Sequence, residues 1–239
     1  MICTLFCKHT NAQIVATYKY INSGLSKIQT VNTYVNGNEA LSVFKSLSPT
    51  DTFYTNDYGT VNFTKDGDDA IGCQYYTNGS TQKMVFRDFV SIDAKFKPAI
   101  IEEPIPTFNW VLKPDTLIIA GYLCNLAFLK FRGREYKAWY TTEIPTSFGP
   151  WKFYGLPGLI INIATTDGKI RFSLTELKKI KNNIIQKPSN GKKITFKEYI
   201  KLQNSAIDEF IDKFKAGMPR GATVDVKIGS NEGLELNYN

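Results

Sequence analysis

Apolar and polar positions alternate over short stretches in much of the chain. Residues 30–35 alternate in part, and residues 14–20 and 40–44 combine β-branched and aromatic side chains. A period of two is typical of a strand that buries one face. The turn Asn36-Gly37-Asn38 separates two of these runs, and Asp167-Gly168 separates two β-branched runs further on. Both turns favour tight β-hairpins.

Further strands are expected through the middle of the chain. Residues 71–76 and 82–89 form one expected pair, and three successive strands are expected at 108–112, 121–131 and 134–140. The turn Arg132-Gly133 suits a hairpin between the last two. By contrast, residues 48–69 are polar and rich in turn formers, which predicts a loop. Three prolines favour short edge pieces in the region that contains them: Pro98, Pro104 and Pro106.

One amphipathic helix is expected late in the chain. Thr195 and Glu198 have the spacing of a capping box, in which each side chain bonds the other's backbone N–H. Gly217 and Pro219 supply the stop. The apolar residues follow a helical period and favour core packing over a partner-binding face: Phe196, Tyr199, Ile200, Ile207, Phe210, Ile211 and Phe214.

This order of elements predicts a mainly β protein of the α+β class. Strands joined by short hairpins favour a curved antiparallel sheet, a sandwich or a partly open barrel. Alternating β and α units, which a doubly wound fold requires, are absent from the pattern. We expect residues 13–239 to form a single β-rich domain, because the chain of 239 residues suits one hydrophobic core.

Composition and charge limit the classes of protein to which this chain can belong. The chain is 43% hydrophobic and 13% aromatic, which supports a real core. It has no run of about 18 apolar residues, so we expect no transmembrane segment. The net charge is +7, with lysines spread along the chain. No nucleic-acid motif accompanies this charge, so nucleic-acid binding is not expected.

The N-terminal residues resemble the end of a secretory signal. A short apolar piece precedes Asn11-Ala12 and Gln13, as at a signal-peptide cleavage site. We therefore expect residues 1–12 to be the remnant of a signal peptide. The protein would then be exported, and either periplasmic or associated with the outer membrane.

Few catalytic residue types remain after that removal. His9 is the one histidine and lies in the expected remnant, which excludes histidine-dependent hydrolases and imidazole metal sites. The nucleotide-binding motifs are also missing, and no cofactor is expected. Of the four cysteines, Cys73 and Cys124 lie beyond the remnant. In an oxidising envelope they could form a disulfide, or they could remain two free thiols.

The most constrained stretch of the chain is residues 139–161. It combines prolines, which fix φ, with glycines, which allow positive φ or a close approach, and with large aromatic side chains. The aromatic residues could form a platform for a flat apolar ligand, or they could fill the core beneath a rigid loop. The candidate binding or structural residues are Trp139, Tyr140, Glu143, Pro145, Phe148, Gly149, Pro150, Trp151, Phe153, Tyr154, Gly155, Leu156, Pro157 and Gly158.

A pair of carboxylates leaves one enzymatic alternative open. Glu135 and Glu143 flank the start of the constrained stretch, and two carboxylates beside aromatic rings would suit glycoside hydrolysis. The alternative function is thus a carboxylate-dependent hydrolase of envelope or imported glycans. It requires both carboxyl groups to face one cleft, although the residues are eight positions apart along an extended chain.

The constrained stretch also resembles a known family. The segments 139–145, 148–153 and Gly155-Leu-Pro-Gly-Leu-Ile160 are similar to the signature of the GLPGLI family of Bacteroidetes envelopes, and Ile119-Ala-Gly-Tyr-Leu-Cys124 resembles an upstream segment of that family. Tyr154 departs from the pattern, since small residues are frequent there. The resemblance implies a signal peptide and an accessory role beside outer-membrane receptors. It implies no catalytic residues.

The sequence as a whole favours an exported, non-catalytic envelope protein. We expect it to bind a partner, such as an outer-membrane receptor or another envelope protein, or an apolar ligand. The surface expected to do so surrounds residues 139–160. A purely structural role for the same residues is the remaining alternative.

Overall fold

The computed structural model describes residues 13–25, 27–46, 52–55, 61–64, 69–92, 95–181, 185–205 and 233–236. The expected signal remnant, residues 1–12, lies outside these ranges. So do the helix stop expected at Gly217 and Pro219 and the apolar helix positions from Ile207 onward.

The described chain is mostly strand. The strands are β1 (Gln13–Asn22), β2 (Lys27–Asn36), β3 (Glu39–Ser46), β4 (Thr52–Thr55), β5 (Val61–Thr64), β6 (Cys73–Asn78), β7 (Lys83–Ile92), β8 (Lys95–Pro104), β9 (Val111–Ile119), β10 (Tyr122–Phe131), β11 (Arg134–Thr141), β12 (Leu159–Thr165), β13 (Ile170–Ile180) and β14 (Lys192–Ile194). One helix, residues 196–205, follows β14.

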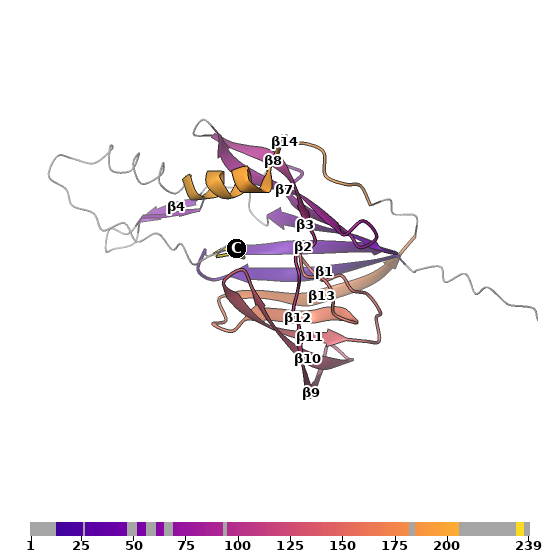
Figure 1. Ribbon diagram of the computed structural model, residues 1–239. Helices are drawn as coiled ribbons and strands as arrows, with labels where there is room; N and C mark the ends of the chain where they lie inside the picture. The colour runs from indigo at the N-terminus through magenta and orange to yellow at the C-terminus, as the bar shows by residue number, and fades with distance from the viewer. Residues whose placement is uncertain are drawn as a thin grey trace, which may run out of the picture.

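Twelve strands form one open sheet in the order β14-β8-β7-β6-β3-β2-β1-β13-β12-β11-β10-β9 (Figure 1). Its neighbours pair antiparallel, except that β14 runs parallel to β8. β4 and β5 pair separately. The mainly β class is confirmed, and of the expected architectures it takes the form of a single open sheet. No helix in the described part of the chain is long and apolar enough to cross a membrane.

The three predicted hairpins are confirmed. Gly37 and Asn38 connect β2 to β3, and the turn after Thr165 connects β12 to β13. Arg132 and Gly133 connect β10 to β11 with φ values of 44° and 82°. Two successive positive φ values define the type I′ turn, whose twist matches that of the flanking strands.

Three strand predictions were wrong. The prolines do not break up β8, which pairs with β7 over its whole length, from Lys95 to Pro104. This is tolerated because β14 covers only residues 99–101 on the other side, so β8 is almost an edge strand. The strand expected at 108–112 begins at Val111. The segment expected to be a loop, 48–69, contains β4 and β5.

The largest core cluster lies on one side of the sheet, which we call the inner face. Along β1, buried and less buried residues alternate, with Ala16, Tyr18 and Tyr20 in the largest core cluster. The Tyr18 hydroxyl donates to the Ile160 carbonyl on β12 at 2.7 Å. Because this hydroxyl is buried, the bond satisfies it and ties β1 to the strand that follows the constrained stretch.

The helix covers the inner face at the β7–β8 end of the sheet (Figure 1). Tyr199 packs there against Phe86 and Val90 of β7 and Ile101 of β8. The predicted capping box is confirmed: Glu198 Oε2 accepts from the Thr195 N–H at 2.8 Å, and Thr195 Oγ1 accepts from the Glu198 N–H at 3.1 Å. The predicted apolar stripe is therefore core packing over the part that the structure describes.

Candidate functional site

Residues 142–158, which we call the signature loop, connect β11 to β12 and fold as a short arm. The Gly149 N–H donates to the Phe153 carbonyl and the Gly155 N–H donates to the Ser147 carbonyl, both at 2.8 Å. Phe148 and Tyr154 form a β-bridge between the two sides of the arm. The loop is therefore hydrogen-bonded within itself.

Three glycines of the signature loop stand where a side chain would disturb the structure, for different physical reasons. A Cβ on Gly158 would lie 2.0 Å from the Thr141 carbonyl oxygen, and one on Gly149 would lie 2.6 Å from a methyl group of Ile160. Gly155 has open space, with its nearest neighbours at 3.9 Å, but a φ of +98°. Close approach thus requires glycine at two positions and backbone conformation requires it at the third.

The tip of the arm, Trp151 to Phe153, is pressed into the inner face of the sheet. Trp151, Lys152 and Phe153 are 3%, 2% and 2% exposed. Trp151 has a φ of 59°, in the left-handed region that costs a non-glycine residue about 1–2 kcal/mol. The Phe153 ring lies 5.0 Å from that of Tyr136 and 5.1 Å from that of Trp151. The favourable burial of these rings offsets the backbone strain.

The four aromatic residues of the predicted platform differ in how deeply they are buried. Tyr140 and Trp151 are buried in the largest core cluster, and Trp139 is half-buried at its margin. Tyr154 is half-buried against a smaller cluster that contains Phe148. The Trp139 ring has the Lys137 ammonium 5.4 Å from its centre. An exposed platform of all four rings does not form, because the inner face takes up the largest apolar surfaces first.

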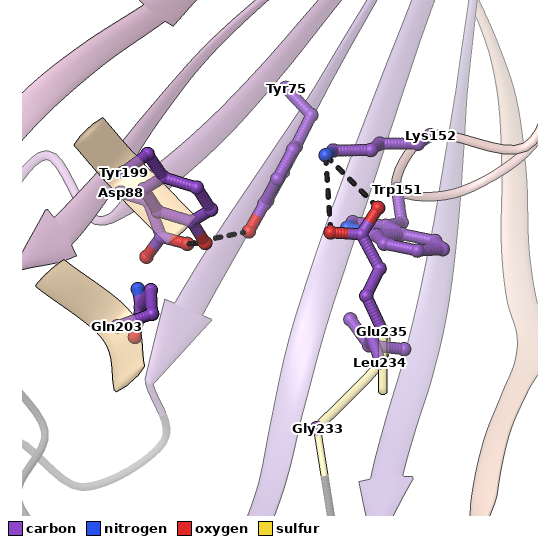
Figure 2. A pocket seen from close by; sticks show the side chains of 9 residues that line it. All are labelled: Tyr75, Asp88, Trp151, Lys152, Tyr199, Gln203, Gly233, Leu234 and Glu235. Carbon is purple, nitrogen blue, oxygen red and sulfur yellow. Dashed lines mark hydrogen bonds and ion pairs between the residues drawn. The ribbon is translucent and has the colours of Figure 1, made fainter. Parts of the chain in front are cut away.

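The tip also carries a buried charge that the sequence did not predict. The Lys152 ammonium lies 2.7 Å from Glu103 on β8 and 3.2 Å from Glu235 near the end of the chain (Figure 2 shows the second contact). Arg132, in the β10–β11 turn, pairs with the same two carboxylates. The four side chains form what we call the ion cluster, in which each charge has an opposite neighbour.

The ion cluster sits among aromatic rings. The Lys152 ammonium is 4.0 Å from the centre of the Phe86 ring, and the Arg132 guanidinium is 4.8 Å from that of Phe196. Burial alone would lower the pKa of Arg132, but Glu235 and Glu103 raise it above its usual value. Buried charges of this kind are retained when they are paired and hydrogen-bonded. The cluster holds β8, the β10–β11 turn, the loop tip and residues 233–236 together.

Sequence reasoning missed these residues for a definite reason. Lys152 follows a tryptophan in an aromatic loop, which is the one local hint that its ammonium is buried. Its partners, Glu103 and Glu235, lie 49 and 83 positions away in the chain. A single sequence gives no means of pairing charges over such separations.

The carboxylates of the hydrolase alternative are apart. Glu135 lies at the start of β11 and pairs with Lys130 at 2.8 Å on an exposed hairpin. Glu143 lies beyond the other end of β11, where its Oε1 accepts from the Leu123 N–H at 3.0 Å. The seven residues from Glu135 to Thr141 alone span about 20 Å of strand. The two carboxylates of a glycosidase are separated by only about 5–10 Å, so this pair does not form such a site.

Cys73 and Cys124 are not joined by a disulfide. The Cys73 thiol, on β6, donates to Asp88 at 3.3 Å. Cys124 is buried on β10, seven strands further along the sheet. The structure thus shows the second of the two alternatives for these residues. Within the described ranges, no group of three His, Cys, Asp or Glu side chains is placed to hold a metal ion.

The flank of the signature loop, Glu143 to Phe148, forms one wall of an open groove of about 700 Å³. The opposite wall comes from the ends of β1, β2 and β13, with Ile14, Val35 and Leu177. Glu143 and Lys179 stand at its rim. The groove is therefore apolar inside, charged at its edges, and bounded by a loop that is already ordered.

The structure thus divides eleven of the fourteen predicted site residues between two places, and Trp139, Tyr154 and Gly155 belong to neither. Tip residues fill the core, and flank residues face the groove. Those of the tip and its base are Tyr140, Gly149, Pro150, Trp151, Phe153, Leu156 and Gly158, and those of the groove are Glu143, Pro145, Phe148 and Pro157.

Comparisons with known proteins bear on the loop and on the fold separately. Residues 126–162 match a family model described as a protein of unknown function, Porph_ging. The model is named for Porphyromonas gingivalis and fits a Bacteroidetes-type family. The match runs from β10 through the whole signature loop into β12. No curated protein matches the sequence.

Among solved structures, the chain is similar to PNGF-II in two crystal forms, with TM-scores of 0.57 and 0.56. Sequence identity is 15% in both, and the match covers 82% of this chain but 34% and 33% of PNGF-II. The chain thus spans about a third of the length of that relative. An uncharacterized conserved protein from Thermus thermophilus matches with a TM-score of 0.41 and 9% identity, over 77% of this chain and 90% of that one. At these identities the likeness to PNGF-II concerns the fold alone.

Proposed function

We propose that the protein is an exported, non-catalytic binding protein of a Bacteroidetes-type cell envelope. Its expected place is the periplasm or the periplasmic side of the outer membrane. Export is supported by the signal-like sequence of residues 1–13 and by the resemblance of the signature loop to the GLPGLI family. Assignment to that family is part of the proposal.

The groove beside the signature loop carries the binding proposal. Its interior is apolar, its rim bears both charges, and its volume of about 700 Å³ can take several side chains. An apolar centre within a polar rim is the usual anatomy of a protein-binding surface. The loop's internal hydrogen bonds hold the wall in place before binding, which lowers the entropy lost on association.

The occupant proposed is an apolar segment of another envelope protein, such as an outer-membrane receptor. The groove is partly open to solvent and not an enclosed cavity, so a polypeptide segment can reach it from outside. Its volume also falls within the range of small-molecule sites, about 300–1,000 Å³. A free apolar ligand is therefore the second candidate.

Site-specific photo-cross-linking in the native envelope tests the binding proposal. A photoreactive residue at Ser147, exposed on the flank, should give a defined adduct. The same residue at Thr166, exposed in the β12–β13 turn, should give none. Equal adducts at both positions, or none at either, would contradict a specific role for the groove.

A matched pair of charge substitutions tests whether the groove makes the contact that gives the Ser147 adduct. Leu177→Glu places a carboxylate at the half-buried wall of the groove, and Ile118→Glu places one on β9, where the side chain is 72% exposed. We expect the first to abolish the Ser147 adduct and the second to preserve it. Extraction of the purified protein with organic solvent distinguishes the candidates: a recovered lipid would favour the free ligand, a cross-linked polypeptide the partner.

A further inference from the structure

A second pocket, separate from the groove, opens beside the ion cluster on the inner face (Figure 2). It has a volume of about 210 Å³ and lies between β6, β7, the helix, the loop tip and residues 233–236. Nothing in the proposed function uses it. Its donors and acceptors indicate what it can hold.

Asp88 on β7 is the central polar group of this pocket. Its Oδ2 accepts from the Tyr199 hydroxyl at 2.7 Å and from the Tyr75 hydroxyl at 3.4 Å (Figure 2). Its Oδ1 accepts from the Cys73 thiol at 3.3 Å and from the Phe89 N–H at 2.8 Å. All four donors are neutral, so the carboxylate is well oriented but its charge has no counter-ion among them.

The cations nearby are already paired. Lys152 and Arg132 are both bound by Glu103 and Glu235 within the ion cluster. No lysine or arginine in the described ranges forms an ion pair with Asp88. The ion cluster is neutral as a set, and within the described ranges no cation compensates the negative charge of Asp88 beside it. A half-buried negative charge attracts a cation more strongly than one in bulk water does.

The remaining walls present acceptors and aromatic faces. Tyr75 and Tyr199 each have one hydroxyl proton, and both protons point at Asp88. Gln203 donates its amide to a main-chain carbonyl of β7 at 3.2 Å. Trp151 and the two tyrosines contribute ring surface to the pocket. Aromatic rings beside a carboxylate favour a positively charged ligand, because the ring face carries negative potential.

We propose that this pocket binds a protonated amine or a guanidinium group, with Asp88 as the counter-ion. A volume of about 210 Å³ admits a head group with a short chain, and is smaller than the sites of drug-sized molecules. The head group comes either from a free small amine or from a lysine or arginine side chain of another protein. Both sources share the chemistry that the pocket recognises.

Chemical-shift titration of the isotopically labelled full-length protein tests the proposal. The probes are n-butylammonium, n-butylguanidinium and the neutral n-butanol. The chain has three tryptophans, whose indole N–H signals report on separate places. We expect the two cations to shift the Trp151 signal with a Kd in roughly the millimolar range or tighter, and to leave the Trp139 signal unchanged. We expect n-butanol to shift neither signal.

A charge-matched pair of variants locates the counter-ion. Asp88→Asn keeps the size of the side chain and removes its charge. Glu102→Gln removes an exposed carboxylate that pairs with Lys83 and Lys187 on the other side of β8. We expect the first change to weaken butylammonium binding by about tenfold or more, and the second to change it by less than about twofold.

The results of these titrations distinguish the two sources of the head group and show whether the proposal fails. Tighter binding of a short lysine-containing peptide than of butylammonium would indicate a protein side chain, and the reverse would indicate a free amine. Two results would overturn the proposal: equal shifts of the Trp151 signal with the cations and with n-butanol, or no shift with any of the three probes. Both results come from the unsubstituted protein, so they stand even if Asp88→Asn fails to fold. Leu177→Glu in the groove should leave amine binding unchanged, so this test and that of the proposed function fail independently.

Discussion

The tip and the flank of the signature loop belong to one short arm but meet opposite environments. Lys152 at the tip is 2% exposed and holds two carboxylates from distant parts of the chain. Pro145 and Ser147 on the flank are exposed and border an open groove. The arm is thus inserted into the core at one end and borders the open groove along its side.

The difference is consistent with the proposed role of the constrained stretch in a non-catalytic binding protein. A rigid wall needs an anchor, and the buried tip supplies it through apolar area and the ion cluster. The flank can then vary in contact with a partner without loss of the fold. Substitutions at the two ends should therefore separate stability from binding.

The largest effect is expected at Gly158, where the arm returns to β12. Gly158→Ala places a methyl group 2.0 Å from the Thr141 carbonyl oxygen, a main-chain atom that cannot rotate away. We expect a loss of about 4 kcal/mol or more of unfolding free energy, measured by urea denaturation. Gly168→Ala is the control, since its Cβ meets nothing within 4 Å and only its φ of +73° is unfavourable. A control loss as large as that of Gly158→Ala would contradict the close-packing account.

The second-largest loss of stability is expected when the buried ammonium of Lys152 is removed. Lys152→Met keeps the aliphatic chain but leaves Glu103 and Glu235 with one cation between them. Breaking a buried pair costs about 3–5 kcal/mol. In a double-mutant cycle, Glu103→Gln should recover part of that loss, because it removes one of the uncompensated charges. Additive losses would mean that the two groups do not interact.

The core around the tip should also set an alkaline limit. Burial raises the pKa of Tyr18, Tyr20 and Tyr136 above the usual value, so the folded state keeps them protonated. The unfolded chain releases these protons above about pH 10. Stability is therefore full below that pH and falls as the pH rises further. A spectrophotometric titration should show part of the 13 tyrosines ionising only as the protein unfolds. Ionisation of all of them before any loss of structure would contradict their burial.

The smallest effect on stability is expected on the flank. Pro145→Ala changes an exposed side chain at the groove rim, and surface changes of this kind usually alter stability by less than about 0.5 kcal/mol. Thermal unfolding should therefore be almost unchanged, while the cross-linking yield at Ser147 falls. A loss of stability comparable to that of Lys152→Met would abolish the distinction between tip and flank.

Local patterns predicted much of the fold. The period-two runs, the turns at Gly37, Gly133 and Gly168 and the capping box at Thr195 are all properties of neighbouring residues, and they were confirmed. The predictions failed where the structure of a segment depends on the strands that pair with it. Pro98 lies within a full strand because β14 leaves most of that side of β8 unpaired. Nothing near Pro98 in the sequence records this.

The site was predictable only in part, for the same reason. Proline, glycine and aromatic content identified the signature loop and its rigidity. The division into tip and flank depends on which residues the inner face receives, and the ion cluster joins positions 103, 132, 152 and 235. Asp88 is an ordinary strand residue in the sequence. Its place between Tyr75 and Tyr199 exists only once the helix is docked.

Native-state hydrogen exchange of the loop amides tests the anchoring of the arm most directly. The N–H groups of Gly149 and Gly155 donate within the arm at 2.8 Å. If the buried tip fixes the arm, these amides exchange only through global unfolding, as slowly as those of the central strands β1 and β13. Exchange of both amides much faster than those strands would show that the arm opens locally, and would contradict a preordered wall for the groove.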